Sequence, residues 1–246
     1  MANGFDPRAT ARPQPGTAGV GREGVAYDAG LRSYMLSVYN YMASGVLLTG
    51  IVALLFANSG MAEQVLMGPG LLKYLIMFAP LGFVMVLSFG ITRLSTGTAQ
   101  LLYWAFAVVM GLSMASIFLV FTGESIAQTF FATAAAFLGL SLWGYTTKKD
   151  LSGFGTFLIM GVVGLLVAMV INIFLQSSAL QLAVSAIGVL LFAGLTAYDT
   201  QRIKSLYFHV AGSDMMGKTA IMGALSLYLD FVNMFTFLLQ FMGSRE

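Results

Sequence analysis

A single aspartate, Asp230, interrupts an apolar run that extends from Thr219 to Ser244. Eleven uncharged residues precede it and fourteen follow it. A carboxylate at the centre of a membrane-spanning helix costs roughly 2.5–3.5 kcal/mol on insertion scales. A second acid, Asp199, ends the preceding apolar run. Two acids placed at such a cost predict a site that handles protons or cations.

The composition predicts a protein dissolved in lipid. Of the 246 residues, 58% are hydrophobic and only 9% are charged, whereas soluble domains carry about 25% charged residues. The formal net charge of +2 gives no argument for nucleic acid as a partner. Because cysteine is absent and His209 is the only histidine, disulfides, thiolate metal sites and histidine-rich metal centres are excluded.

The chain divides into a tail and a membrane domain. Residues 1–31 lack the continuous apolar stretch of a signal peptide, and we expect a disordered basic tail. Its arginines and prolines are Arg8, Arg12, Arg22, Pro7, Pro13 and Pro15. Residues 32–246 are predicted to form one transmembrane domain.

Seven apolar segments are long enough to span a bilayer, which takes about 20 residues of helix. The window Leu151–Tyr198 holds 48 uncharged residues and is divided into two helices near Gln176. The fold class is therefore an all-α membrane protein with seven transmembrane helices. The predicted spans are 34–57, 73–93, 99–121, 126–146, 154–175, 179–204 and 219–242.

The distribution of Lys and Arg predicts the orientation. With the N-terminus in the cytoplasm, ten of these residues lie on the inner side, and only Lys73 and Arg245 lie outside. Positive residues accumulate on the cytoplasmic side of membrane proteins. We therefore expect a cytoplasmic N-terminus, an external C-terminus and, in a bacterium, a place in the inner membrane.

The last helix carries a polar stripe on one face, because its members recur every three or four residues. Unpaired polar groups are costly in hydrocarbon, so the stripe should face protein or water. Its members are Thr219, Gly223, Ser226, Asp230, Asn233, Phe237 and Gln240.

The two acids are predicted at different depths. Asp230 lies roughly 16 Å from the inner end of its helix, by helical rise alone. Asp199 lies near the inner face, with Arg202 three residues later on the same side. The acids meet only if Asp199 is drawn inward or the last helix begins late, and the linking segment Ser205–Lys218 leaves room for this.

Two carboxylates that meet in a low dielectric share one proton, because both cannot ionise cheaply. Arg93, at the inner end of the second helix, is the candidate counter-ion, and competition between the two pairings is a natural gate. Simpler interpretations stay open. Asp230 can act as a hydrogen-bonding contact between helices, Asp199 as an interfacial ion pair with Arg202, and Arg93 as a positive anchor.

Two motifs carry a resemblance to a known family. Ala193–Lys204 (AGLTAYDTQRIK) and Ala224–Phe235 (ALSLYLDFVNMF) are similar to the sixth-helix and final-helix signatures of the transmembrane Bax-inhibitor-motif proteins. The resemblance implies six helices wrapped around a central seventh. It also implies a calcium leak controlled by pH through paired aspartates, matched here by Asp199 and Asp230, with Arg93 matching an arginine partner by position. Eukaryotic relatives suppress cell death, and some bacterial relatives associate with a membrane protease.

The leading hypothesis is a pH-sensitive calcium leak channel. Ca²⁺ prefers six to eight oxygen ligands, and Asp199 and Asp230, with Ser226 and Asn233 as pathway candidates, can make a transient site weak enough to release the ion. The alternative is a regulatory or scaffolding protein that binds another membrane protein. We expect no enzymatic activity, because neither HExxH nor GxSxG occurs. No cofactor is expected; the partners are the bilayer, calcium ions and protons.

Overall fold

The computed structural model describes residues 18–245, and their side chains from Ala29 onward. Seven long α-helices follow one another with short connections, and this range also contains a five-residue π-helix, a five-residue 3₁₀-helix and an isolated β-bridge between Phe121 and Arg245. In chain order the helices are α1 Ala18–Asn58, η1 Glu63–Met67, α2 Leu72–Gly90, α3 Thr96–Met114, η2 Ala115–Leu119, α4 Gly123–Thr146, α5 Ser152–Leu175, α6 Ser178–Val210 and α7 Met215–Met242.

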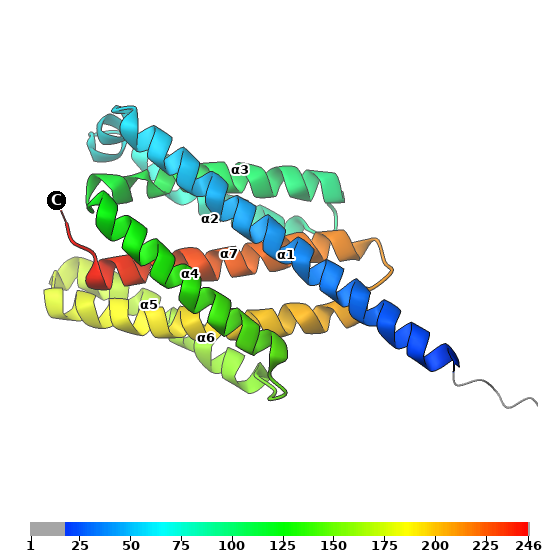
Figure 1. Ribbon diagram of the computed structural model, residues 1–246. Helices are drawn as coiled ribbons and strands as arrows, with labels where there is room; N and C mark the ends of the chain where they lie inside the picture. The colour runs from blue at the N-terminus through cyan, green and yellow to red at the C-terminus, as the bar shows by residue number, and fades with distance from the viewer. Residues whose placement is uncertain (1–17, 246) are drawn as a thin grey trace, which may run out of the picture.

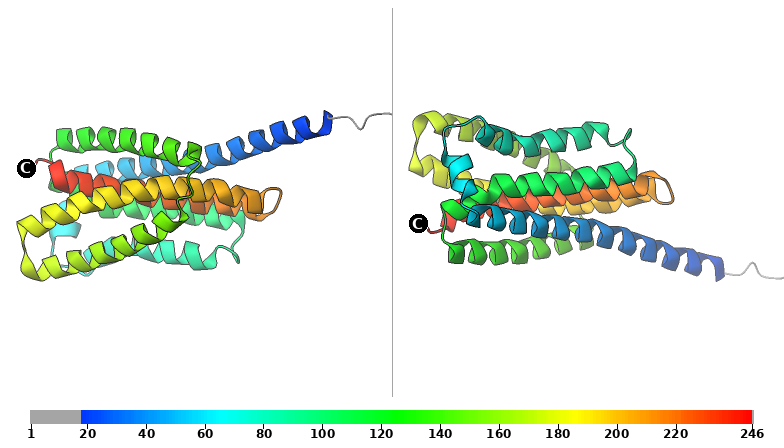
Figure 2. Two further views of the ribbon diagram at one scale, coloured as in Figure 1. Left: turned by 90° about the horizontal axis from the view of Figure 1, so that it is seen from below. Right: turned by 90° about the horizontal axis from the view of Figure 1, so that it is seen from above.

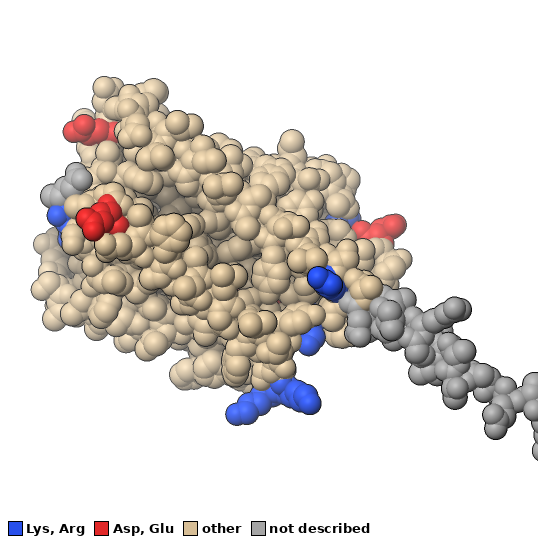
Figure 3. All heavy atoms as spheres, in the orientation of Figure 1, with Lys and Arg blue, Asp and Glu red and all other residues tan. Residues whose placement is uncertain are grey.

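Seven helices of the described chain are long and apolar enough to cross a membrane, with mean hydropathies from 1.5 to 2.8, which confirms the predicted fold class. Large apolar side chains such as Phe89 and Phe174 are 80% exposed, as expected for helices that face lipid. On the face drawn in Figure 3, charged side chains gather toward the margins and a broad uncharged band lies between them.

The last helix, α7, is the central one. In its apolar window 67% of the residues are buried inside the protein, against 11–28% for the other six helices. It packs mainly against α1, α3, α4 and α6, whereas α2 packs on α3 and α5 packs on α6 from outside. Figures 1 and 2 show α7, in orange and red, inside the bundle from each direction.

Small residues allow α6 to lie close to its neighbours. A Cβ atom on Gly188 would lie 2.6 Å from Cγ of Phe237, and one on Gly144 would overlap the backbone of Ala197. Because the hydrophobic effect does not drive helices together in lipid, such close contacts supply van der Waals attraction instead. Glycine at these two positions therefore fixes the separation of α6 from α7 and from α4.

Several predicted boundaries differ from the structure, among them the start of the first helix and the end of the sixth. The sequence predicts a tail over residues 1–31, but α1 begins at Ala18, since residues 18–31 contain no proline to stop the helix. The predicted disorder of residues 1–17 falls outside the described residues. The sixth helix is predicted to end at residue 204, yet α6 continues to Val210. Hydropathy falls there because of charged residues, but buried Ile203 and Tyr207 maintain the helical period.

Candidate functional site: an aspartate pair between α6 and α7

The polar stripe of α7 faces α6. A Cβ atom on Gly223 would lie 3.1 Å from a methyl group of Ile203. Fourteen residues later, the ring of Phe237 stacks on Phe192 of α6, with centroids 5.8 Å apart and planes 21° apart. The prediction that the stripe faces protein rather than lipid therefore agrees with these contacts.

The stacked pair also sets the register of the two aspartates. Asp199 follows Phe192 by seven residues, and Asp230 precedes Phe237 by seven residues. Seven residues make about two turns and return to nearly the same face of a helix. Because α6 and α7 are antiparallel neighbours (Figure 1), this register sets Asp199 opposite Asp230. The charge of Asp199 accordingly acts on the carboxyl of Asp230.

The extended α6 is what makes this meeting possible. The expected link of fourteen residues, Ser205–Lys218, is replaced by a turn of four, residues 211–214, between Val210 and Met215. Gly212 adopts a φ of 75° in this turn, a conformation that favours glycine. The longer α6 places Asp199 eleven residues from the end of its helix, which draws it inward toward the level of Asp230, whereas α7 begins four residues earlier than predicted rather than late.

Asp230 is buried without full hydrogen bonding. Its side chain is 4% exposed, and no protein group donates a hydrogen bond to the buried Oδ2. A buried polar atom left without a partner costs about 1–3 kcal/mol. The sequence left open a role for Asp230 as a hydrogen-bonding contact between helices, but no protein group donates a hydrogen bond to this oxygen. The atom is thus available to a proton or a cation.

Asp199 is partly exposed and has a nearby positive charge. The guanidinium of Arg202, one turn along α6, is the basic group whose charge acts on it. Arg93 lies exposed in the turn after α2. The positive charge that acts on Asp199 therefore comes from Arg202 on the same helix. The role of Arg93 as a counter-ion of the aspartates stays a prediction.

The two pathway candidates lie on the same stripe as Asp230. Ser226 is partly buried one turn away from it. Asn233 donates a hydrogen bond from Nδ2 to the carbonyl oxygen of Leu229 at 2.8 Å, which leaves its Oδ1 as an acceptor. Among the described residues, no three acidic, histidine or cysteine side chains come together as a metal site. These oxygens therefore fit transient ion contact better than tight binding.

A chain of hydroxyl groups beside Asp199 was not anticipated from the sequence. The Tyr39 hydroxyl lies 2.6 Å from Oγ of Ser141, which lies 2.9 Å from Oγ1 of Thr200. Thr200 in turn donates to the carbonyl oxygen of Thr196. The chain links α1, α4 and α6 and ends at the residue after Asp199. Its members come from three distant segments, so no motif could have joined them.

A groove between α1 and α4 leads to these hydroxyl groups. It has a volume of about 440 Å³. Its lining residues are Arg32, Met35, Leu36, Tyr39, Leu138, Ser141, Leu142 and Tyr145. Arg32 places a positive charge at this groove, and the hydroxyls of Tyr39 and Ser141 add polar groups to it.

Aromatic side chains pack next to Asp230 toward the C-terminal end of α7. Phe231 makes edge-to-face contacts with Phe130 and Phe137, each with a centroid distance of 5.6 Å. Phe235 continues this packing against Phe130 at 6.3 Å. These rings therefore form an apolar layer on the C-terminal side of Asp230.

Comparison with known proteins agrees with the family resemblance of the two motifs. The family described as "Inhibitor of apoptosis-promoting Bax1" matches residues 31–246. The chain belongs to this Bax inhibitor family. Its relatives there include the inner membrane protein YbhL of Escherichia coli K12, which is 45% identical over 89% of this chain and 94% of its own length.

Other relatives in the family cover similar lengths. A protein of Caulobacter vibrioides is 47% identical over 92% of this chain and 94% of its own length. The protein RP147 of Rickettsia prowazekii is 46% identical over 89% of this chain and 93% of its own length. The similarity therefore spans the seven-helix domain.

Proposed function

We propose that this membrane protein is a pH-sensitive leak pathway for cations, with Ca²⁺ as the favoured ion and the Asp199–Asp230 pair as its proton sensor. The observation that carries the proposal is the buried Asp230 carboxyl, which has an oxygen without a protein donor and a second acid acting on it. Neither contact with solvent nor a hydrogen bond to this oxygen offsets the free-energy cost of burying the Asp230 carboxyl.

The physical argument rests on charge in a low dielectric. Two neighbouring carboxylates away from water cannot both ionise without a compensating positive charge. A bound proton or a bound cation supplies that charge, so the two compete for the same pair of carboxyl groups. Changing the pH therefore changes the occupancy of Asp199 and Asp230 by cations.

Conduction further requires the aromatic layer to open. Phe231 lies next to Asp230 on α7, so a change in the separation of α6 and α7 moves its ring relative to Phe130 and Phe137. Discrete repacking of this kind is how small local shifts are amplified in packed helices. In this proposal the protonation state of the aspartates selects between the closed and open packings.

The orientation and location form part of the proposal. The excess of Lys and Arg on one side supports a cytoplasmic N-terminus. The similarity to YbhL, an inner membrane protein, supports the bacterial inner membrane. We propose no enzymatic activity and no cofactor other than the permeating ion.

The test is Ca²⁺ uptake into liposomes that contain the purified protein, measured over a pH series. We expect Asp199→Asn and Asp230→Asn each to flatten the pH dependence, because a single remaining carboxyl has no second acid with which to share a proton. Asp214→Asn, at an exposed aspartate of the α6–α7 turn, is the matched control and should keep the wild-type profile. Arg93→Ala should shift the midpoint of the pH profile, and an unmoved midpoint would make Arg93 a positive anchor instead.

Two outcomes contradict the proposal. A wild-type pH profile in both aspartate variants would remove the sensor from this site. Purified protein that passes no Ca²⁺ at any pH would instead favour the alternative, a regulatory or scaffolding protein for another membrane protein.

A further inference from the structure

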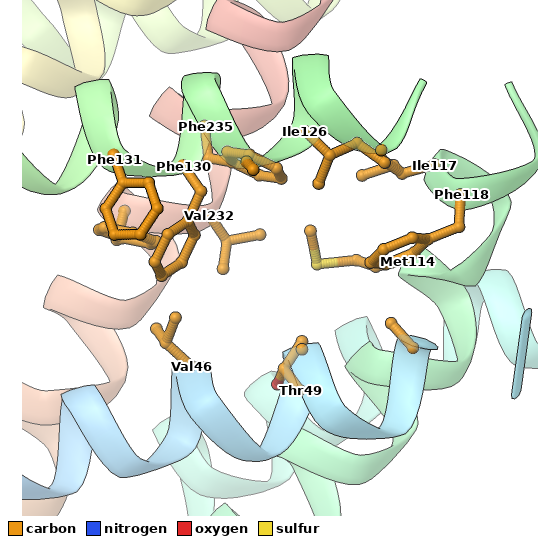
Figure 4. A pocket seen from close by; sticks show the side chains of 15 residues that line it. Val46, Thr49, Met114, Ile117, Phe118, Ile126, Phe130, Phe131, Val232 and Phe235 are labelled. Atoms are coloured by element: carbon orange, nitrogen blue, oxygen red, sulfur yellow. The ribbon is translucent and has the colours of Figure 1, made fainter. Parts of the chain in front are cut away.

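An apolar cavity of about 310 Å³ lies beside the central helix, toward the C-terminal end of α7. Figure 4 shows the side chains of α1, α4, α7 and the 3₁₀-helix η2 directed into this space. Thr49 is the one lining residue with a polar side chain. The lining residues are Val46, Thr49, Gly50, Ala53, Met114, Ile117, Phe118, Gly123, Ile126, Ala127, Phe130, Phe131, Phe231, Val232 and Phe235.

The cavity connects the lipid-facing surface to the protein interior. Phe131 is 72% exposed and Phe130 37% exposed, whereas Phe231 and Phe235 on α7 are only 5% and 7% exposed. The cavity therefore opens on the side of the protein that the bilayer surrounds.

The walls offer nothing to a polar ligand. The Thr49 hydroxyl is already engaged, since it donates to the carbonyl oxygen of Ala107 at 2.8 Å and lies 2.7 Å from the Tyr228 hydroxyl. An apolar cavity of about 150 Å³ stays dry and binds small hydrocarbons, because water needs several polar partners. A cavity about twice that size with a similar lining is expected to take hydrocarbon.

The size and shape favour a flexible chain over a second protein. A helix with its side chains is about 10–12 Å across, too wide to enter a space of 310 Å³ enclosed by several elements. Acyl chains, in contrast, are the solvent at the opening. Van der Waals contact with the aromatic walls replaces the contacts that the chain leaves in the bilayer.

We propose that this cavity is a binding site for one acyl chain of a membrane lipid. The chain enters past Phe131 and reaches Phe231 and Val232, the two residues that follow Asp230 on α7. Its occupancy thereby stabilises the packing of α7 against α1 and α4. This inference does not depend on ion conduction, because it follows from the lining and the opening alone.

The experiment uses a phospholipid that carries a photoreactive diazirine in its acyl chain, in liposomes with the full-length protein. After illumination, labelled residues are mapped by mass spectrometry. We expect labelling at Met114 and Phe118 inside the cavity as well as at Phe174, which is 80% exposed on α5 and reports the bulk lipid. In detergent, added oleic acid should suppress the labelling of Met114 and Phe118 but not of Phe174.

A matched pair of variants tests the site. A Cβ atom on Gly50 or on Gly164 meets nothing within 4 Å, so neither position clashes with the first atom of a new side chain. Gly50 lines the cavity and Gly164 is exposed on α5. Gly50→Phe places a ring in the cavity and should lower cavity labelling by about tenfold, which corresponds to a loss of about 1.4 kcal/mol in binding free energy. Gly164→Phe should leave the labelling unchanged.

Three results would overturn the inference. The first is unchanged labelling of Met114 and Phe118 in Gly50→Phe. The second is wild-type labelling confined to outer residues such as Phe131 and Phe174. The third is modification of Met114 by a water-soluble reagent, which would show a hydrated cavity. Because the second and third results concern the wild-type protein, the inference can be refuted even if Gly50→Phe does not fold.

Discussion

Replacing Asp230 with leucine should make the protein more stable while it removes the proton sensor. Leucine has the same branching as aspartate, so two methyl groups take the positions of the two carboxyl oxygens. Oδ2 is buried without a protein donor, and removing such an orphan recovers about 1–3 kcal/mol. Because methyl groups are larger than oxygens, leucine overpacks the site, and this lowers the gain in free energy of unfolding.

The net expectation is a stabilisation of about 1–2 kcal/mol, which for a chain of this length raises the midpoint of thermal unfolding by roughly 2–8 °C. The measurement is thermal unfolding of the purified protein in one detergent, at one pH and one protein concentration. Val232→Ala is a useful comparison, because it removes methyl groups from a 7% exposed side chain on the same helix and should lower the midpoint.

The result that refutes this reasoning is a lower midpoint for Asp230→Leu. A loss of about 2 kcal/mol or more would mean that the carboxyl holds the helices together, as a buried hydrogen-bonded acid does. Asp230 would then be a structural contact, and its cost would no longer require a function. Stability and Ca²⁺ flux thus test the two interpretations of this residue separately.

Two further predictions concern polar contacts elsewhere. Thr49→Val should destabilise the protein more than Tyr228→Phe, because it leaves the buried Tyr228 hydroxyl without a partner, whereas Thr49 still donates to Ala107 in the second variant; equal midpoints in thermal unfolding would contradict this. Hydrogen bonds from Ser152 lower the pKa of Asp150 below its ordinary 3.8, so its ionised form contributes stability above that pH and loses it as the pH falls. Asp150→Ala should therefore be less stable than wild type at neutral pH and equal to it in strong acid, and a gap that persists in acid would exclude the charge as its cause.

The sequence by itself determined which segments span the membrane and which helix is unusual. Hydropathy and helical periodicity are local properties, so seven apolar runs and the polar stripe around Asp230 can be read directly. The same stripe indicated that α7 needs protein around it, because polar groups in lipid are costly. The two family motifs added the importance of Asp199.

Only the tertiary structure decided whether the two acids meet. The span predicted from the sequence stops at residue 204 because of charged residues, but α6 continues to Val210 since Ile203 and Tyr207 pack inward. The stacking of Phe192 on Phe237 then sets the register that brings Asp199 opposite Asp230. Helix length at a membrane surface depends on packing, which hydropathy does not report.

The hydroxyl chain and the acyl-chain cavity were likewise decided by tertiary structure. Ser141 and Thr200 are 59 residues apart, and Thr49 and Tyr228 are 179 apart. The cavity exists because the five elements that line it, α1, α3, η2, α4 and α7, do not fill the space between them. A sequence reports the chemistry of each side chain, but contacts and voids between distant helices arise only when those helices pack.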